Sequence, residues 1–315
     1  MHPEQLSGPL PTGAAARVRA LAARAEQADG VAPLSEEPLL RLTDPAAPVR
    51  HLLVREPGAP DVLGYAQVGL DDPAAAVVEL VVDPASRRHG VGRELLASAA
   101  RVAGGPPLVW AHGDLPAARA LAAAAGLVPV ERLWRMRADL ARRPAVPVLP
   151  GGVVARAFDP GHDEDALVRL NARAFADHPD QGRWTRHDVL TREAEPWFDA
   201  AGLLLLERAG VPVAFVWTKV HPAGELEDGP VGELYVVGVD PDAQGGGLGG
   251  ALTALGLDLL ASRGLQVAVL WTSGDNERAV RAYRRAGFAR VAVDVRYGPP
   301  DRTGPDATEG ATMGA

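Results

Sequence analysis

A glycine-rich stretch is the part of this sequence whose residue types and spacing most clearly indicate chemistry. Residues 244–250, QGGGLGG, follow an apolar run that ends at Asp240-Pro241 and precede leucines spaced as on a helix. A glycine turn that opens a helix points backbone N–H groups and the positive end of the helix dipole at one place. Because glycine lacks a Cβ atom, a ligand can approach the backbone closely. The stretch therefore predicts a diphosphate-binding loop.

The spacing differs from the two best-known nucleotide loops. A Walker loop ends in Gly-Lys-Ser/Thr, and a dinucleotide fold has G-x-G-x-x-G in an early βαβ unit. Here Q-x-x-G-x-G follows a V-x-V-D-P strand, and residues 273–288 read SGDNERAVRAYRRAGF. A lone glycine motif is often only a flexible loop, but two linked motifs seldom are. The combination resembles the GNAT superfamily of acyl-CoA-dependent N-acetyltransferases, whose loop holds the CoA pyrophosphate.

The glycine motif occurs twice. Residues 80–92 lie over residues 237–249 with a constant offset, since Asp240 minus Asp83 and Gly249 minus Gly92 both give 157. An internal repeat of this kind predicts two domains of one fold. With the resemblance, this predicts an α/β protein with mixed sheets and two tandem GNAT domains. The expected parts are an N-terminal domain (1–140), a proline-rich linker (141–152), a C-terminal catalytic domain (153–298) and a disordered tail (299–315).

Hydrophobic periodicity and breakers predict the elements that carry these motifs. Helices are expected at residues 14–28, 93–102, 116–125, 163–176, 248–260 and 276–286. A further short helix is expected to begin after Ser35, which is its candidate N-cap. Strands are expected at 51–55, 62–68, 76–82, 107–111, 153–157, 203–208, 213–220, 233–239, 267–272 and 288–296. Residues 175–189, FADHPDQGRWTRHDV, are polar and indicate an irregular loop over a site.

The two copies differ where N-acetyl transfer needs a base for the amine and a proton for the leaving thiolate. Glu233 is the candidate base, and subtracting 157 places Ala76 at its first-copy position. Aligning Gly287 with Gly126 gives an offset of 161, which places Tyr283 on Ala122 and Asn276 on Leu115. By the resemblance, Tyr283 looks like the general acid that protonates the CoA sulfur. We therefore expect catalysis only in the second copy, while the first keeps a motif that can bind CoA.

Composition excludes several classes of protein. A length of 315 residues with 47% hydrophobic content suits two cores, and a net charge of −8 without a basic block argues against nucleic acid as a partner. There is no apolar run of eighteen residues, and the N-terminus lacks the pattern of a signal peptide. We expect a cytoplasmic protein without membrane contact, a monomer. Zero cysteines and eight histidines without ligand spacing predict no metal.

Further features point to one family of GNAT enzymes. They are DGVAPLSEE near the N-terminus, NARAFADHPDQGRWT, Trp217-Thr218-Lys219, GELYVVGVDP and the tandem copies themselves. Across essentially the full chain they resemble the mycothiol synthase family of actinobacteria. The resemblance implies acetyl transfer from acetyl-CoA to the cysteinyl amine of 1D-myo-inositol 2-(L-cysteinylamino)-2-deoxy-α-D-glucopyranoside, the last step of mycothiol synthesis. It implies substrate contacts at Glu36, Asp180, Lys219, Glu233 and Trp271.

The same resemblance implies acetyl-CoA contacts in both copies. In the first copy these are Leu80, Val81, Val82, Arg88, His89, Gly90, Val91, Gly92 and Arg93. In the second they are Val237, Gly238, Val239, Gln244, Gly245, Gly246, Gly247, Leu248, Gly249, Gly250, Asn276, Glu277, Arg278, Ala279, Val280 and Arg281.

The sequence departs from the family pattern at two substrate positions. Trp271 stands where a tyrosine is expected, and Asp180 where a glutamate is commoner. An indole only donates a hydrogen bond, so Trp271 cannot replace the acceptor function of a phenol. Two alternatives therefore stay open. One is a tandem GNAT enzyme for another amine, such as an aminoglycoside, a polyamine or a protein N-terminus; the other is a non-catalytic CoA-binding sensor.

Overall fold

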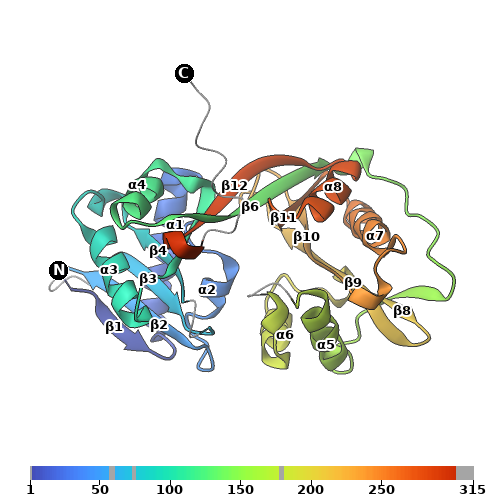
Figure 1. The fold of residues 1–315 in the computed structure, drawn as a ribbon, viewed down its shortest axis with the longest axis horizontal. Helices are drawn as coiled ribbons and strands as arrows, with labels where there is room; N and C mark the ends of the chain where they lie inside the picture. Colours follow the sequence, from blue (N-terminus) through green and yellow to red (C-terminus); the bar gives the residue numbers. More distant parts are fainter. Residues whose placement is uncertain (1, 57–60, 73–75, 177–180, 303–315) are drawn as a thin grey trace, which may run out of the picture. The chain divides into compact units, whose positions relative to one another are not determined.

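The computed structural model describes residues 2–56, 61–72, 76–176 and 181–302, which form two compact units (Figure 1). The first unit consists of the chain up to Leu133 together with the segment from Ala292 onward, and the second is Trp134–Val291. Two strands, β6 (Val128–Asp139) and β12 (Ala289–Gly298), contribute residues to both units. Residues 141–152, predicted as a linker, lie within the second unit.

The sheet of the first unit has the strand order β1-β2-β3-β4-β5-β12. Its strands besides β12 are β1 (Glu4–Ser7), β2 (Val49–Arg55), β3 (Val62–Gly69), β4 (Val77–Val82) and β5 (Leu108–Ala111). Neighbours pair antiparallel except β4 and β5, which are parallel. The helices are α1 (Thr12–Asp29), α2 (Glu36–Leu40), α3 (Val91–Ala103) and α4 (Pro116–Ala124). One core lies between α1 and the sheet, and another joins α3 and α4 to the opposite face.

The second unit repeats this plan with the strand order β6-β11-β10-β9-β8-β7. Its further strands are β7 (Val153–Ala157), β8 (Leu203–Arg208), β9 (Val211–His221), β10 (Val231–Val239) and β11 (Val267–Ser273). The pair β10 and β11 is parallel, like β4 and β5. The helices are α5 (Glu164–Ala174), α6 (Arg186–Glu193), α7 (Leu248–Ser262) and α8 (Glu277–Arg285). A core cluster joins α7 to β9 and β10, and another joins α5 and α6 to the same sheet.

The sequence repeat is also a structural repeat. Asp83 and Asp240 each accept a hydrogen bond from the backbone N–H two residues on, at 3.0 and 2.9 Å, and so open the 3₁₀ turns Pro84–Ser86 and Pro241–Ala243. Gly90 (φ 86°) and Gly247 (φ 80°) then occupy the N-cap positions of α3 and α7, in a backbone conformation that favours glycine. The offset of 157 residues thus relates these elements position by position.

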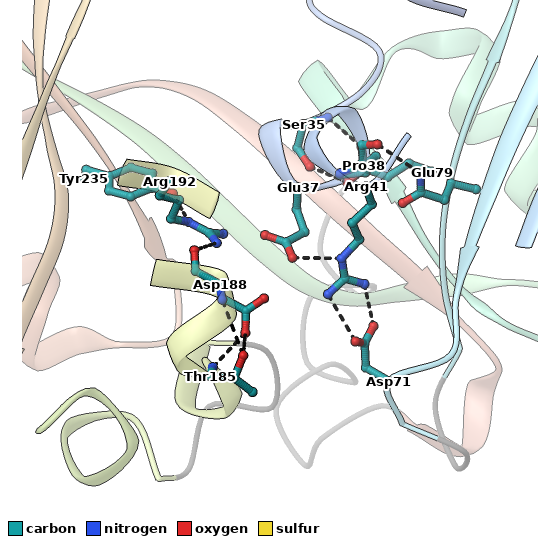
Figure 2. Close-up of polar contacts among 11 residues, drawn as sticks. Ser35, Glu37, Pro38, Arg41, Asp71, Glu79, Thr185, Asp188, Arg192 and Tyr235 are labelled. Carbon is teal, nitrogen blue, oxygen red and sulfur yellow. Dashed lines mark hydrogen bonds and ion pairs between the residues drawn. The ribbon is translucent and has the colours of Figure 1, made fainter. Parts of the chain in front are cut away.

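Three elements were not predicted: β1, β6 and α6. The prediction that residues 175–189 form an irregular loop is wrong from Arg186 onward, where α6 begins. Thr185 and Asp188 form a capping box, in which the Thr185 hydroxyl accepts from the Asp188 N–H and the Asp188 carboxylate accepts from the Thr185 N–H (Figure 2). This short-range signal was present in a polar sequence that offered little periodicity.

Candidate active site

The strands β10 and β11 separate in the middle of the second unit. Their parallel pairing is limited to Gly232 with Ala268 and Glu233 with Val269, whereas β10 stays paired with β9 as far as Val239. Beyond Glu233, the β10 edge that faces β11 therefore lacks a ladder partner. Backbone groups without such a partner are available to an extended ligand that carries amides of its own.

A β-bulge lies at the same place. The register of β10 against β9 shifts between Leu234 and Val236, so Tyr235 is an extra residue on β10. A bulge bends its strand and increases the local twist, and bulges are common beside active sites. The bulge therefore fits the divergence of β10 from β11.

The bulge corrects the predicted equivalence of Ala76 and Glu233. The last residue of β4 pairs with a residue on β3, and the last residue of β10 pairs with a residue on β9. Counting the same number of residues along β3 and β9 from these two partners makes Gly69 equivalent to Lys219. Because Gly69 faces Val77 and Lys219 faces Glu233, the true counterpart of Glu233 is Val77. The alignment was wrong by one residue, since a constant offset ignores the inserted residue. The first unit still lacks a carboxylate at this position.

Glu233 is a buried carboxylate, 7% exposed, with a histidine as its partner. Its Oε2 lies 2.7 Å from Nε2 of His221, whose Nδ1 lies 2.6 Å from Oε1 of Glu225. Burial on its own would lower the pKa of His221, but the hydrogen bonds to both carboxylates and the charge of Glu233 outweigh it, so the pKa is raised. The cationic imidazole is thereby favoured beside the candidate base.

Aromatic rings surround Lys219, the cross-strand neighbour of Glu233. Its Nζ lies 4.6 Å from the ring centroid of Trp197 and 5.7 Å from that of Tyr235. Figure 2 shows the Arg192 side chain directed at Tyr235, whose hydroxyl accepts from Nε at 2.8 Å. Such cation–π contacts and the hydrogen bond hold the lysine and Tyr235 in place. Sequence reasoning missed Trp197, Tyr235, Arg192 and His221, because they come from separate segments with no common local spacing.

Tyr283, the predicted acid, lies on α8 and is partly buried. Its ring makes an edge-to-face contact with Phe288, with centroids 5.9 Å apart, and burial raises the pKa of its hydroxyl to about 12. The hydroxyl therefore keeps its proton at neutral pH, as a proton donor must. Among the described residues, no hydrogen bond joins Tyr283 to Glu233.

The other predicted substrate residues lie on several elements. Val269 is the partner of Glu233 in the parallel pair, and Trp271 lies two residues further along β11. Because side chains alternate between the faces of a sheet, Trp271 lies on the same face as Val269 and Glu233. Glu36 is the first residue of α2 in the first unit and is half-buried. Asp180 lies outside the residues that the structure describes.

The predicted diphosphate loop of the second unit has an open backbone. Gly245 and Gly247 have φ of 88° and 80°, which explains glycine at these positions. A Cβ atom at Gly246, Gly249 or Gly250 would meet no other atom within 4 Å, so packing inside the protein does not require glycine there. Close approach of a ligand would explain it, at the N-terminal end of α7.

The N-terminal end of α8 lies against this loop. Nη1 of Arg278 donates to Oε1 of Gln244 at 2.6 Å, and the Asn276 side chain caps the helix by accepting from the Ala279 N–H at 3.0 Å. Arg281 pairs with Glu277 on the exposed side of α8. In contrast, the side chains of Val280 and Leu248 are buried in the protein.

The first unit contains a cavity of about 900 Å³ at the corresponding position. It is lined by all the predicted CoA-contacting residues of this unit except His89 and Val91. Arg88 and Arg93 are exposed at this site and have no ion-pair partner among the described residues. Two such cations are suited to phosphate groups.

The same cavity shows what the first unit lacks. An offset of 161 carries α4 (Pro116–Ala124) onto α8 (Glu277–Arg285), with Leu115 and Asn276 as N-caps. Ala122, which lines the cavity, consequently stands at the position of Tyr283. The predicted alignment of the late helices is correct, and the first unit has no counterpart of the candidate base or of the candidate acid.

A buried ionic network occupies the first unit instead, and Figure 2 shows its contact between Ser35 and Glu79. The backbone N–H and hydroxyl of Ser35 both donate to Glu79 at 2.6 Å, and His112 lies 3.2 Å from Glu79 and 3.4 Å from Asp294. Burial acts to lower the pKa of His112, but the charges of Glu79 and Asp294 and their hydrogen bonds raise it to about 10. His112 is therefore a structural cation at neutral pH.

Comparison with known proteins agrees with this geometry. Residues 18–126 and 166–288 match the model of the acetyltransferase (GNAT) family, so the chain belongs to this family and the predicted fold class and acetyltransferase activity are confirmed. It is 56% identical over 312 residues to the mycothiol acetyltransferase of Cellulomonas flavigena, covering 95% of this chain and 90% of that protein. It is 53% identical over 305 residues to that of Sanguibacter keddieii, covering 93% and 96%. These relatives confirm the resemblance to the mycothiol synthase family.

Solved structures support the tandem fold. A GCN5-related N-acetyltransferase from Sphaerobacter thermophilus aligns with a TM-score of 0.66 and 24% identity, covering 95% of this chain and 96% of that one. A tandem GNAT protein from the clavulanic acid biosynthesis pathway aligns with a TM-score of 0.67 and 19% identity, covering 94% and 98%. Among the described residues, no helix is long and apolar enough to cross a membrane, and no three His, Asp or Glu side chains are grouped to hold a metal ion.

The network around His112 predicts a pH dependence of stability. Since the folded pKa of about 10 exceeds the unfolded value of about 6.5, the ion pair stabilises fully below pH 6.5 and its contribution is lost as the pH rises through 10. We expect the unfolding free energy to fall over this range with a slope approaching about 1.4 kcal/mol per pH unit. Urea unfolding at several pH values would measure it.

The control for this prediction is another histidine of the same unit. His112→Gln should flatten the pH dependence, whereas His89→Gln, at an exposed position, should leave it as in the wild type. An unchanged slope in His112→Gln would contradict the assignment.

Proposed function

We propose that this acetyltransferase transfers the acetyl group of acetyl-CoA to the cysteinyl amine of 1D-myo-inositol 2-(L-cysteinylamino)-2-deoxy-α-D-glucopyranoside, the final step of mycothiol synthesis. The observation that carries the proposal is Glu233, a buried carboxylate placed where β10 leaves β11. The acceptor is suggested by relatives named mycothiol acetyltransferase, which are 46–56% identical over most of the chain.

The proposed reaction starts with the acceptor as an ammonium ion, because an α-amino group has a pKa of about 7.7–8.0. Glu233 takes one proton, directly or through water, and the free amine attacks the thioester carbonyl. The backbone of residues 237–239, on the edge that β11 leaves open, binds the donor and polarises this carbonyl. The C–S bond then breaks and the Tyr283 hydroxyl protonates the sulfur; the phenolate recovers a proton from the nitrogen. The products are the amide, CoA and one released proton.

Recognition of the acceptor is assigned to polar groups near the base. Lys219 can donate hydrogen bonds to sugar or inositol hydroxyls, and its position is fixed by Trp197 and Tyr235. Trp271 offers an indole on the same face of the sheet as Glu233. For Glu36, which belongs to the first unit, and Asp180, which lies outside the described residues, the family resemblance alone supports a role as acceptors of hydroxyl hydrogen bonds.

The first unit is proposed to bind CoA or acetyl-CoA without transferring the acetyl group. Its cavity carries the glycine motif, with Arg88 and Arg93 available for phosphate. Val77 and Ala122 stand where the second unit has its base and acid. We further propose that the protein is a monomer that acts in the cytoplasm and uses acetyl-CoA as its acetyl donor.

The acceptor is tested by comparing amines under identical conditions. The cysteinyl-glucosaminyl-inositol amine, an aminoglycoside, a polyamine and cysteine alone would be incubated with acetyl-CoA, and the products followed by mass. We expect kcat/KM to be highest for the cysteinyl compound. A preference for another amine would replace the acceptor, and binding of CoA without any transfer would favour the CoA sensor.

The base and acid are tested by replacements that keep the shape of the side chain. Glu233→Gln and Tyr283→Phe should each lower kcat by about 10²–10⁴-fold, the usual contribution of one general acid or base. The measurement is steady-state turnover with acetyl-CoA near saturation.

Matched controls come from similar side chains elsewhere. Tyr297→Phe removes a hydroxyl that donates a hydrogen bond to Asp114 in the first unit. Glu207→Gln changes a carboxylate on β8 that accepts a hydrogen bond from Arg156. Both should keep kcat within a few-fold. Wild-type turnover in Glu233→Gln or in Tyr283→Phe would refute the corresponding role.

The role of the first unit is tested by counting binding sites. Calorimetric titration of the wild type with acetyl-CoA should give two sites per chain, and the double variant Arg88→Ala, Arg93→Ala should give one while keeping its kcat. The control is Arg101→Ala, which should leave two sites. Arg101 is an exposed residue of α3, the helix that carries Arg93, and it pairs with Glu94. A single site in the wild type would contradict this role.

A further inference from the structure

A buried histidine beside the proposed base has no part in the reaction described above. His221 is 5% exposed and stands at the last position of β9, between two carboxylates. Glu233 comes from the neighbouring strand β10, and Glu225 comes from the turn that follows β9. A histidine held in this way changes both the position and the charge of the groups it contacts.

The three side chains form a path from the buried base to the surface. The Glu233 side chain is 10% exposed and that of His221 is 7% exposed, whereas the Glu225 side chain is 46% exposed. The two contacts along the path are 2.7 and 2.6 Å, within hydrogen-bond range. A proton that reaches the interior end can therefore be balanced by one that leaves at the exposed end.

The charges around His221 favour its protonated form. Both ring nitrogens face carboxylate oxygens, so the imidazolium donates to both, and these contacts raise its pKa against the effect of burial. Lys219, from the same strand, opposes this with a like charge. With both carboxylates ionised, the three side chains together carry one negative charge.

We propose that His221 is a positioning and proton-relay residue for Glu233. It holds Oε2 of the carboxylate, which leaves Oε1 to receive the proton of the acceptor amine. Within the part of the chain that the structure describes, no hydrogen bond of Oε1 is found. The inference rests on the proposed role of Glu233 as the base.

The protons balance in each step of this relay. When Glu233 takes a proton from the ammonium group of the acceptor, an N–H bond of that group breaks and an O–H bond forms at Oε1 of Glu233. His221 then gives its Nδ1 proton to Glu225, which passes it to solvent. The three side chains again carry one negative charge, so no additional charge is created in the buried site. After the product leaves, Glu233 releases its proton to solvent and His221 takes one up from solvent through Glu225, so one proton is released in each turnover.

Three variants separate positioning from proton transfer. In His221→Gln, the side-chain amide can still donate to Glu233, but it cannot release or accept a proton. His221→Ala removes both functions, and Glu225→Gln keeps an acceptor for Nδ1 but removes the charge. His162→Gln, at an exposed histidine paired with Asp159, is the matched control. Each would be assayed over pH with the amine that the wild type acetylates fastest.

We expect kcat to fall about 10-fold in His221→Gln and up to about 100-fold in His221→Ala, less than the loss of a general base itself. The acidic limb of the kcat/KM profile should move to higher pH in both, since a cation beside the carboxylates is lost. It should move to lower pH in Glu225→Gln, since a negative charge is lost. KM for acetyl-CoA should stay at the wild-type value, whereas the melting temperature should fall, most in His221→Ala, because a buried carboxylate loses its partner. His162→Gln should match the wild type throughout.

Two results would overturn the proposal. One is wild-type kcat and pH profile in His221→Gln and His221→Ala. The other is a loss of kcat with no movement of the acidic limb, which is what a purely structural histidine would give. If Glu233→Gln is inactive and the His221 variants are normal, only the relay fails; if Glu233→Gln is fully active, the proposed base itself is wrong.

Discussion

The proposed active site of this protein depends on the early end of one parallel strand pair. The strands β10 and β11 share two residue pairs, and the bulge at Tyr235 turns β10 away just beyond Glu233. Ladder hydrogen bonds that are not made leave backbone donors and acceptors that need other partners. In an enzyme for acetyl-CoA, an amide-containing ligand can supply them. The site is thus created by an interruption of secondary structure, with Glu233 at its inner limit.

The first unit has an equally short parallel strand pair, for which a different role is proposed. The parallel pair of β4 and β5 is just as short, and the adjacent glycine motif and cavity are present. Yet Val77 replaces the carboxylate and Ala122 replaces the phenol. In the proposed assignment, two side chains on an otherwise repeated framework separate a site for binding alone from one equipped for transfer. This agrees with the general rule that function resides in the site and not in the fold.

The sequence predicted those features that depend on local chemistry. Positive-φ glycines, the Asp-Pro strand ends and the helix caps impose their residue types at fixed spacings, so the offsets of 157 and 161 could be found without a structure. The bulge at Tyr235 could not, because register depends on pairing with β9. Nor could the contact of His221 with Glu233, which joins two strands through their alignment. The strand β12 was predicted at residues 288–296, but its pairing with β5 of the first unit was not, because that pairing depends on contacts that no local pattern encodes.

A comparison of two histidines shows how the proposed base differs from a structural ion pair. Each unit places a histidine between two carboxylates, as Glu79–His112–Asp294 in the first and Glu233–His221–Glu225 in the second. In the first, Ser35 donates twice to Glu79, so both of its carboxylate oxygens already accept hydrogen bonds. In the second, only one oxygen of Glu233 has a partner among the described residues, and Glu225 reaches solvent. A buried carboxylate that is fully hydrogen-bonded stabilises the fold, whereas one with a free oxygen and a route for charge to leave can accept a proton from a substrate.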